Sequence, residues 1–442
     1  MTHQNVDSPS QVWDKLSKLL PTREVDSEFW WQLTGRHLAI LVDAAGYSLE
    51  RQYEALLFHY HWAVSHMGRK PSPSGELQYK SAITIEGSPI EYSWKWNKRS
   101  PTSQPDIRYS LEPIGPVSGT TQDPENRQAG TKLARRLAAA FQADLTWTDH
   151  FLSTLFDQGQ HQRALELAEA GTPTGTTFAV AAEFVPSGLG FKTYCAPRAV
   201  TPPFLPHIEL FTPSLRQLHP TSPARDALLD FLSSGPEGQA LMPLMVAVDA
   251  VSSAKSRLKW YFMTPHTSFA SARDIITLGG RRPNMDKTVE EVRTLIHAAV
   301  GLPAGFSDNE ELPSAPRHDP ASDKYAGEAP NSPPGLIYYF DIQPDKPLPE
   351  VKLYVPVWRY ASDDLSVARR TVEWMKERGR GSYADRFLGM LERLADHRAL
   401  SDGSGLQASV SCVCNEGDEL DVTTYLTPEA KHAKRWANGS SN

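Results

Sequence analysis

The chain has 442 residues, with 45 Lys and Arg against 52 Asp and Glu, so its formal net charge is −7. Hydrophobic residues make up 40% of the chain, which excludes intrinsic disorder for most of it and supplies enough apolar surface for a large core. The mild acidity argues against a nucleic-acid-binding protein, because phosphate contacts need clustered Lys and Arg. No apolar run approaches the roughly 18–20 residues of a membrane span, and we see no signal-peptide pattern at the N-terminus.

Helical and strand patterns alternate along the chain in repeating blocks. Apolar residues at helical spacing predict helices over 29–45 and 49–66, and the segments 90–96 and 107–112 then alternate apolar and polar residues as strands do. The same order, helices followed by two strands, recurs four more times. The later helices are expected at 127–142, 147–170, 222–234, 268–278, 287–300, 364–378 and 382–398, and the later strands at 177–184, 191–196, 244–248, 257–263, 337–342, 351–357, 407–413 and 420–426.

Ten strands joined mainly as hairpins should form an antiparallel sheet whose apolar face is covered by the helices. Closing this sheet into a barrel would remove its edges and leave the polar face around a lumen, whereas an open sheet would expose that face to water. We expect a single domain over 1–442, with an ordered core over about 10–436. The stretch 306–334 is rich in Pro, Ser, Asp and Glu, which predicts a mobile loop.

The polar face of the second strand in each pair carries cations and tyrosines. A Lys-x-Tyr step joins Lys192 to Tyr194, Lys259 to Tyr261 and Lys352 to Tyr354, and Arg108, Arg257 and Tyr425 occupy equivalent faces. One such step is typical of a solvated sheet face. In a closed barrel, however, the five cations would converge and repel one another unless an anion lay among them. Arg and Lys bind phosphate oxygens, and tyrosine rings stabilise a cation by about 0.5–2 kcal/mol per contact, so the set indicates ionisation of an allylic diphosphate.

Glu91 is the candidate base, because it lies on the polar face of the first strand between Ile90 and Tyr92. A carboxylate there could accept a proton or a hydrogen bond from an N–H group or a phenol, although a solvated surface glutamate would give the same pattern. The chain has no Asp-Asp-x-x-Asp motif, no P-loop and no GxSxG or HExxH motif. We therefore expect no metal site and no cofactor.

Several long segments resemble the fungal aromatic prenyltransferases of the dimethylallyltryptophan synthase family. They include GSPIEYSWKW, GFKTYCAP, SRLKWYFMTPHTSF, YYFDIQPDKPLPEVKLYVPV and LDVTTYLTPE, and the resemblance spans about 10–436. It implies an α+β fold: a ten-stranded antiparallel barrel of repeated ααββ units with helices outside and a polar, solvent-filled lumen. It also implies metal-independent transfer of a prenyl group, usually dimethylallyl, from its diphosphate to an aromatic ring.

The resemblance assigns roles to matching positions. The diphosphate would be held by Arg108, Lys192, Arg257, Lys259 and Lys352. The allylic cation would be shielded by Tyr194, Tyr261, Tyr354 and Tyr425. Glu91 would bind the N–H or hydroxyl group of the acceptor, which Ala82 and Ile83 would also contact.

The acceptor remains open. Tryptophan-specific members of that family carry a lysine on the first strand of the second pair, whereas this chain has no lysine between Lys132 and Lys192. A larger indole compound, a cyclic dipeptide or a phenolic polyketide is therefore at least as good a candidate as free tryptophan. Two other functions stay possible: a non-catalytic barrel that binds a small anionic or aromatic metabolite, and a phosphatase or cyclase acting on prenyl diphosphates.

The expected partners are dimethylallyl diphosphate and an aromatic small molecule, with no nucleic acid and no membrane, and the protein should be a monomer or a homodimer. Only Cys195, Cys412 and Cys414 are present, too few for a disulfide framework. A reducing, cytoplasmic location is therefore expected.

Overall fold

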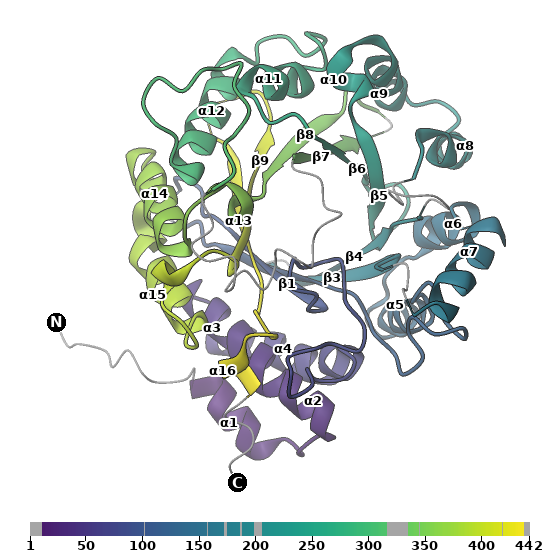
Figure 1. Ribbon diagram of the computed structural model, residues 1–442, viewed down its shortest axis with the longest axis vertical. Coiled ribbons are helices and arrows are strands. Elements are labelled where there is room, and N and C mark those ends of the chain that lie inside the picture. The colour runs from purple at the N-terminus through teal and green to yellow at the C-terminus, as the bar shows by residue number, and fades with distance from the viewer. Residues whose placement is uncertain are drawn as a thin grey trace.

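The computed structural model describes residues 11–100, 102–156, 158–171, 175–185, 188–198, 206–315, 335–343, 345–417 and 419–436. Ten strands form one closed antiparallel barrel, in which each strand pairs with its neighbour in sequence and β1 pairs with β10. Helices surround this barrel on the outside (Figure 1). The closed form is therefore confirmed over the open sheet.

Five hairpins supply the strands. In chain order these are β1 (Ile90–Lys95), β2 (Asp106–Leu111), β3 (Phe178–Val185), β4 (Gly188–Cys195), β5 (Met242–Asp249), β6 (Leu258–Thr264), β7 (Leu336–Ile342), β8 (Glu350–Val355), β9 (Gln407–Cys414) and β10 (Asp421–Leu426). Side chains on each strand alternate between the helical layer and the inside of the barrel. Tyr92 and Trp94 are fully buried on the outer face of β1, as its alternation predicts, and the Trp94 ring packs 5.5 Å from that of Phe387.

The helices precede the strand pairs in the predicted order. They are α1 (Gln11–Leu19), α2 (Val25–Trp30), α3 (Arg36–Ala44), α4 (Leu49–Phe58), α5 (Gln128–Phe141), α6 (Thr146–Thr154), α7 (Gln158–Glu169), α8 (Ile208–Leu218), α9 (Pro223–Ser234), α10 (Pro236–Gln239), α11 (Phe269–Thr277), α12 (Asp286–Val300), α13 (Val357–Tyr360), α14 (Asp364–Glu377), α15 (Ala384–Leu394) and α16 (Ala433–Trp436). Three predicted helices are interrupted: a π-helical turn, Trp31–Gly35, joins α2 to α3, a second one, His59–Ala63, follows α4 within 49–66, and 147–170 contains both α6 and α7.

The prediction missed α8, which carries Pro213 in its interior. Proline removes a backbone donor and normally ends a helical pattern, so its presence hid this helix. Of the loop expected at 306–334, residues 306–315 have no helix or strand, and 316–334 lie outside the described residues.

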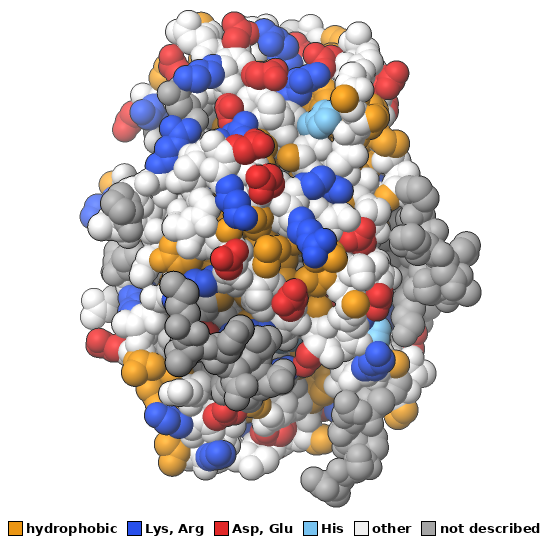
Figure 2. All heavy atoms as spheres, turned by 90° about the vertical axis from the view of Figure 1, so that its left-hand side faces the viewer, with side chains coloured by type: hydrophobic (Ala, Val, Ile, Leu, Met, Phe, Trp, Pro, Cys, Tyr) orange, Lys and Arg blue, Asp and Glu red, His pale blue; other side chains and the backbone are white. Residues whose placement is uncertain are grey.

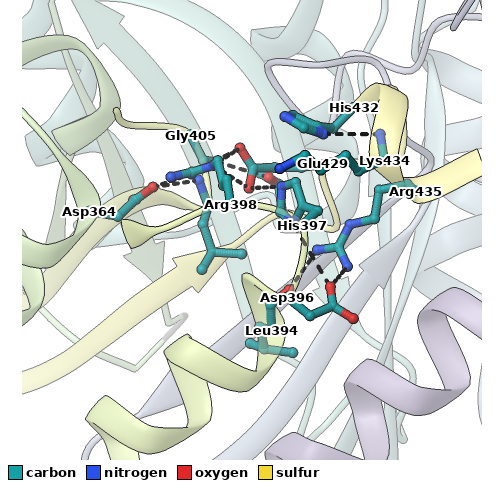
Figure 3. A network of polar contacts seen from close by, with 12 residues as sticks. Asp364, Leu394, Asp396, His397, Arg398, Gly405, Glu429, His432, Lys434 and Arg435 are labelled. Atoms are coloured by element: carbon teal, nitrogen blue, oxygen red, sulfur yellow. Dashed lines mark hydrogen bonds and ion pairs between the residues drawn. The ribbon is translucent and has the colours of Figure 1, made fainter. Parts of the chain in front are cut away.

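A group of charged side chains, which we call the C-terminal cluster, ties the last segment of the chain to the helical layer (Figure 3). Arg398 forms an ion pair with Asp364 at the start of α14 and another, 3.0 Å long, with Glu429. Asp364 also accepts the backbone N–H of Gln407, at 2.8 Å, where β9 begins. The remaining members are Arg36 and Arg435, both ion-paired with Asp396, and His397, whose Nε2 lies 3.0 Å from Glu429.

The outer surface carries both signs of charge. On the face shown in Figure 2, Lys and Arg lie beside Asp and Glu, with single hydrophobic side chains between them. Ion pairs of this kind join Arg378 to Glu291, at 2.6 Å, and Arg293 to Asp308, at 2.8 Å. In the described part of the chain, no helix combines the length and the apolar character that crossing a membrane requires.

Candidate active site

The inward side chains of the barrel form three layers along its axis. Because neighbouring strands run in opposite directions, the ends of odd-numbered strands and the starts of even-numbered strands meet at one end of the barrel. We call this the charged end; it carries Arg108, Glu183, Lys192, Asp249, Arg257, Lys259, Asp341 and Lys352. Further along the axis lie Tyr194, Tyr261, Tyr339, Tyr354 and Tyr425. Glu91 stands at the opposite end, the glutamate end, where β1 begins.

Asp249 is the centre of the charged end. Its Oδ2 accepts a hydrogen bond from Arg257 Nε at 2.8 Å, and its Oδ1 lies 3.3 Å from Lys259 Nζ and 3.7 Å from Lys192 Nζ. Burial opposes ionisation of Asp249, but the charges of Lys259, Lys192 and Arg257 hold its pKa below the ordinary range. One carboxylate thus keeps three of the predicted phosphate-binding cations together.

Two other carboxylates pair with the same cations. Glu183 forms an ion pair with Arg108 Nη1 at 2.9 Å and accepts a hydrogen bond from Lys192, and Asp341 Oδ2 lies 3.7 Å from Arg257 Nη1. The sequence analysis expected an anion among these cations, and carboxylates of the protein itself occupy that position here. The sequence argument considered only the cationic strands and omitted the carboxylates on β3, β5 and β7.

Burial also affects the lysines. It lowers the pKa of Lys192 to about 8, although Glu183 opposes this, and it lowers the pKa of Lys259 against the opposing charge of Asp249. Lys192 therefore remains mostly charged at neutral pH, which binding of an anion requires.

The tyrosines contact one another in a continuous group. Ring centroids lie 6.2 Å apart for Tyr194 and Tyr261, 5.2 Å for Tyr261 and Tyr339, and 5.4 Å for Tyr354 and Tyr425. Tyr339 was not predicted. A usable signal was present, because Asp341 must face inward and Tyr339, two residues before it on β7, shares its face.

Lys352 connects the charged end to the tyrosines. Its Nζ lies 4.9 Å from the centroid of the Tyr354 ring and 5.4 Å from that of Tyr425, and it donates a 3.1 Å hydrogen bond to the Tyr425 hydroxyl. No carboxylate of the described residues lies within ion-pair distance of Lys352. A positive charge can therefore rest against these rings without a carboxylate partner.

Glu91 faces the inside of the barrel, with Ser110 of β2 directly opposite in the register. Burial raises the pKa of its carboxyl group to about 8, and the nearby charge of Lys352 only partly opposes this. Glu91 is thus largely protonated at neutral pH, and it must lose that proton before it can act as a base.

Ala82 and Ile83 lie in an irregular segment that leads into β1 at the glutamate end. Ala82 is exposed and Ile83 is half-buried. The backbone N–H of Ala82 donates a 2.8 Å hydrogen bond to the hydroxyl of Thr176, which lies just before β3. The barrel therefore brings these two residues to the same end as Glu91.

The arrangement can bind a polyanion at one end, stabilise a carbocation beside the tyrosines and polarise an acceptor near Glu91. Among the described residues there is no group of three or more His, Cys, Asp or Glu that could hold a metal ion. All three cysteines are buried and free, and Cys412 and Cys414 are packed on β9.

Comparisons with known proteins agree with this chemistry. The family model described as "Tryptophan dimethylallyltransferase" matches residues 26–390. The chain is 47% identical to "Prenyltransferase anuH" of Penicillium roqueforti over 96% of this chain and 93% of that protein. It is 42% identical to "Xanthone prenyltransferase B" of Emericella nidulans, with the same shares covered. A solved structure of NotF in complex with brevianamide F and DMSPP has a TM-score of 0.76 at 21% identity, covering 96% of this chain and 99% of that one, and shares the fold.

Proposed function

Because this chain belongs to the tryptophan dimethylallyltransferase family and is an aromatic prenyltransferase, we propose that it transfers a dimethylallyl group from its diphosphate to a phenolic acceptor without a metal ion. The observation that carries this proposal is the order of the three layers, with cations, tyrosines and Glu91 following one another along the barrel axis. Three free, buried cysteines support the expected cytoplasmic location.

The layers assign the steps of the reaction. Arg108, Lys192, Arg257, Lys259 and Lys352 hold the diphosphate and stabilise its growing charge as the allylic C–O bond breaks and the diphosphate leaves with the bonding electrons. The tyrosines face the resulting allylic cation. A ring carbon of the acceptor then bonds to the cation while ionised Glu91 takes the phenol proton, which leaves a dienone. That ring carbon loses its proton to the departed diphosphate, and the dienone oxygen takes a proton back from Glu91, which restores the aromatic phenol.

Two observations support a phenolic acceptor. The inward residues of β3 are Ala179, Ala181 and Glu183, so this strand offers no lysine to accept a proton from an indole ring. Two relatives, at 42% and 38% identity, are named xanthone prenyltransferases, and a xanthone is an oxygen heterocycle without an indole N–H group. An indole acceptor is the second candidate, because brevianamide F is bound in the NotF complex.

The function is tested by incubating the protein with dimethylallyl diphosphate and separate sets of xanthones, simple phenols, indoles and cyclic dipeptides, with and without excess EDTA. We expect a mass gain of one C5H8 unit on a phenolic compound, at a rate that EDTA does not change. Activity that disappears with EDTA and returns with magnesium would contradict the cation-based donor site. Tight binding of both substrates with no product would instead favour the non-catalytic barrel.

The role of Glu91 is tested by its pH dependence. Since the pKa of Glu91 is about 8, kcat/KM for the acceptor should rise as the pH increases towards about 8, until loss of the charge of Lys192, whose pKa is also about 8, weakens binding of the donor. Glu91→Gln should remove this rise and lower prenylation by roughly 10²–10⁴-fold, the range for general acid–base groups. Slow hydrolysis of the donor should persist in the variant, because ionisation needs only the cations and tyrosines.

The stability of the folded protein should also depend on the ionisation of Glu91, but it should fall with rising pH where the activity rises. The folded pKa lies above the ordinary value of 4.5, so Glu91 favours the folded state most below pH 4.5. This contribution should be lost as the pH rises through about 8.

A parallel loss of prenylation and donor hydrolysis in Glu91→Gln would show that the residue acts through the structure.

A further inference from the structure

Glu112 is a fully buried carboxylate at the glutamate end, one residue after β2. It accepts hydrogen bonds from the Tyr79 hydroxyl at 3.0 Å, from Asn126 Nδ2 at 2.8 Å and from the Thr176 hydroxyl. No cation of the described residues lies within ion-pair distance of it. Burial raises its pKa, and the hydrogen bonds that it accepts only partly oppose this.

Thr176 extends this network to the acceptor segment. Its hydroxyl group donates to Glu112 and at the same time accepts the backbone N–H of Ala82 at 2.8 Å. Tyr79 fixes the same segment from the other side, since its hydroxyl reaches Glu112 as well. The segment has no helix or strand of its own, so these bonds, together with the bond from the Ser81 backbone N–H to the Gly87 carbonyl at 3.0 Å, hold Ala82 in place.

Glu112 also contacts the entrance to β1. Its backbone N–H donates to the carbonyl of Pro89 at 2.8 Å, and Glu91 follows two residues later. The two features expected to meet the acceptor, the Ala82 segment and Glu91, are therefore both attached to one buried residue. The charge of Arg198 reaches Glu112 although the two form no ion pair, and Arg198 also donates to the backbone carbonyl of Thr176 at 2.7 Å. Because a well-packed apolar residue would often stabilise such a position equally well, a buried carboxylate whose hydrogen bonds go to Tyr79 and Thr176 indicates that geometry rather than stability is served.

We propose that Glu112, acting through Thr176, is a positioning residue that fixes the orientation of the acceptor over the allylic cation. This role rests on the proposed function, because it requires an aromatic acceptor at the glutamate end. It predicts that loosening the network changes where the acceptor is prenylated and how well it binds. The charged end, to which Glu112 makes no contact, should bind and ionise the donor as before.

The test compares two neighbouring threonines. Thr176→Val keeps the side-chain shape but removes the hydrogen bonds to Glu112 and from the N–H of Ala82. The control, Thr177→Val, also removes a buried hydrogen bond of a threonine hydroxyl, but that bond goes to the carbonyl of Glu125 and does not involve the acceptor segment. For Thr176→Val we expect kcat/KM for the acceptor to fall by about 10- to 100-fold, the loss that a misplacement near 1 Å can cause. The ratio of prenylated positions should also change. Donor KM and donor hydrolysis should stay within about twofold of the wild type, and Thr177→Val should keep the wild-type product ratio.

Two further variants keep the test decisive if Thr176→Val folds poorly. Thr176→Ser restores both bonds and should restore the product ratio, and Tyr79→Phe removes one donor to Glu112 and should shift the ratio in the same direction by less. Equal acceptor kinetics and product ratios in Thr176→Val and Thr177→Val would overturn this role, as would a parallel fall in donor hydrolysis. A wild-type protein that prenylates no aromatic compound would overturn the proposed function and this role with it.

Discussion

Two groups of charged side chains in this protein look alike but differ in how completely their charges are balanced. In the C-terminal cluster three arginines meet three carboxylates, and Glu429 and Asp364 are only 2% and 1% exposed. At the charged end the five cations expected to hold the diphosphate meet four carboxylates within ion-pair distance among the described residues: Glu183, Asp249, Asp341 and also Asp106, two residues before Arg108 on β2. In the described part of the chain Lys352 has no carboxylate within that distance, and it contacts Tyr354 and Tyr425.

The pKa values show how each group responds to burial. In the C-terminal cluster His397 and Arg398 lower the pKa of Glu429 to about 2 against the effect of burial, although burial raises that of Asp364 to about 6. At the charged end burial lowers the pKa of Lys192 to about 8, which leaves its charge close to titration. A cluster in which each arginine meets a carboxylate stabilises the fold, whereas a lysine that faces the inside of the barrel without a carboxylate partner favours binding of an anion.

The comparison is tested most strongly by Arg398→Met. This change leaves Asp364 and Glu429 buried without their shared cation, so we expect the free energy of unfolding to fall by about 3–5 kcal/mol, as measured by urea denaturation. Arg281→Met is the control, because its partner Asp230 is exposed and the pair should contribute less than about 1 kcal/mol. Equal free energies of unfolding for the two variants would show that the C-terminal cluster does not stabilise the fold more than an exposed ion pair does.

Lys259→Met, in contrast, should lower the activity but not the stability of the protein. Asp249 keeps Arg257 and Lys192 as partners, so the free energy of unfolding should change little. Turnover should fall by about 10²–10³-fold, because a charge that stabilises the departing diphosphate is lost. The exposed Lys255, in the turn between β5 and β6, gives the matched control Lys255→Met, which should retain wild-type turnover. A Lys259→Met protein that is unfolded, or fully active, would contradict the distinction between the two groups.

The smallest effect is expected for the tyrosines. Tyr339→Leu removes one ring from the inner group, and since such a contact contributes about 0.5–2 kcal/mol, kcat should fall by about 2- to 30-fold. Tyr338→Leu alters the adjacent side chain, which is buried on the outer face of β7. It should lower the melting temperature but leave kcat of the folded protein unchanged. If both variants lose the same fraction of kcat, the inner tyrosines have no special role in the reaction.

The sequence predicts the barrel well because alternation on the strands is regular and turn-rich segments separate them. From Arg257, just before β6, to Lys259 and Tyr261 on it, the order already gives the axial order of cations and tyrosines, since side chains on one face follow one another along a strand. The family membership is confirmed by the comparisons, whereas the roles of individual residues at the site stay predictions.

Contacts between distant segments could not be predicted. Asp249 meets Lys192 and Lys259 only because β5 lies between β4 and β6 in the closed sheet. Glu112 ends the alternating run 107–112, but it is 64 residues from Thr176, and nothing in either pattern links the two side chains. The C-terminal cluster likewise joins segments whose spacing in sequence carries no signal.

The pairing of β1 with β10 has a consequence for how the chain folds. Trp94 lies opposite Thr424 in this pairing, and the Trp96 indole N–H donates to the Thr424 hydroxyl at 3.2 Å. Joining residues about 330 positions apart costs more chain entropy than closing any of the five hairpins, so it belongs at the end of folding rather than at its start. During synthesis the ribosome must release almost the whole chain before β1 and β10 can pair. Until then β1 has an open edge, and the nascent chain depends on its helices, or on chaperones, to keep that edge from pairing with other molecules.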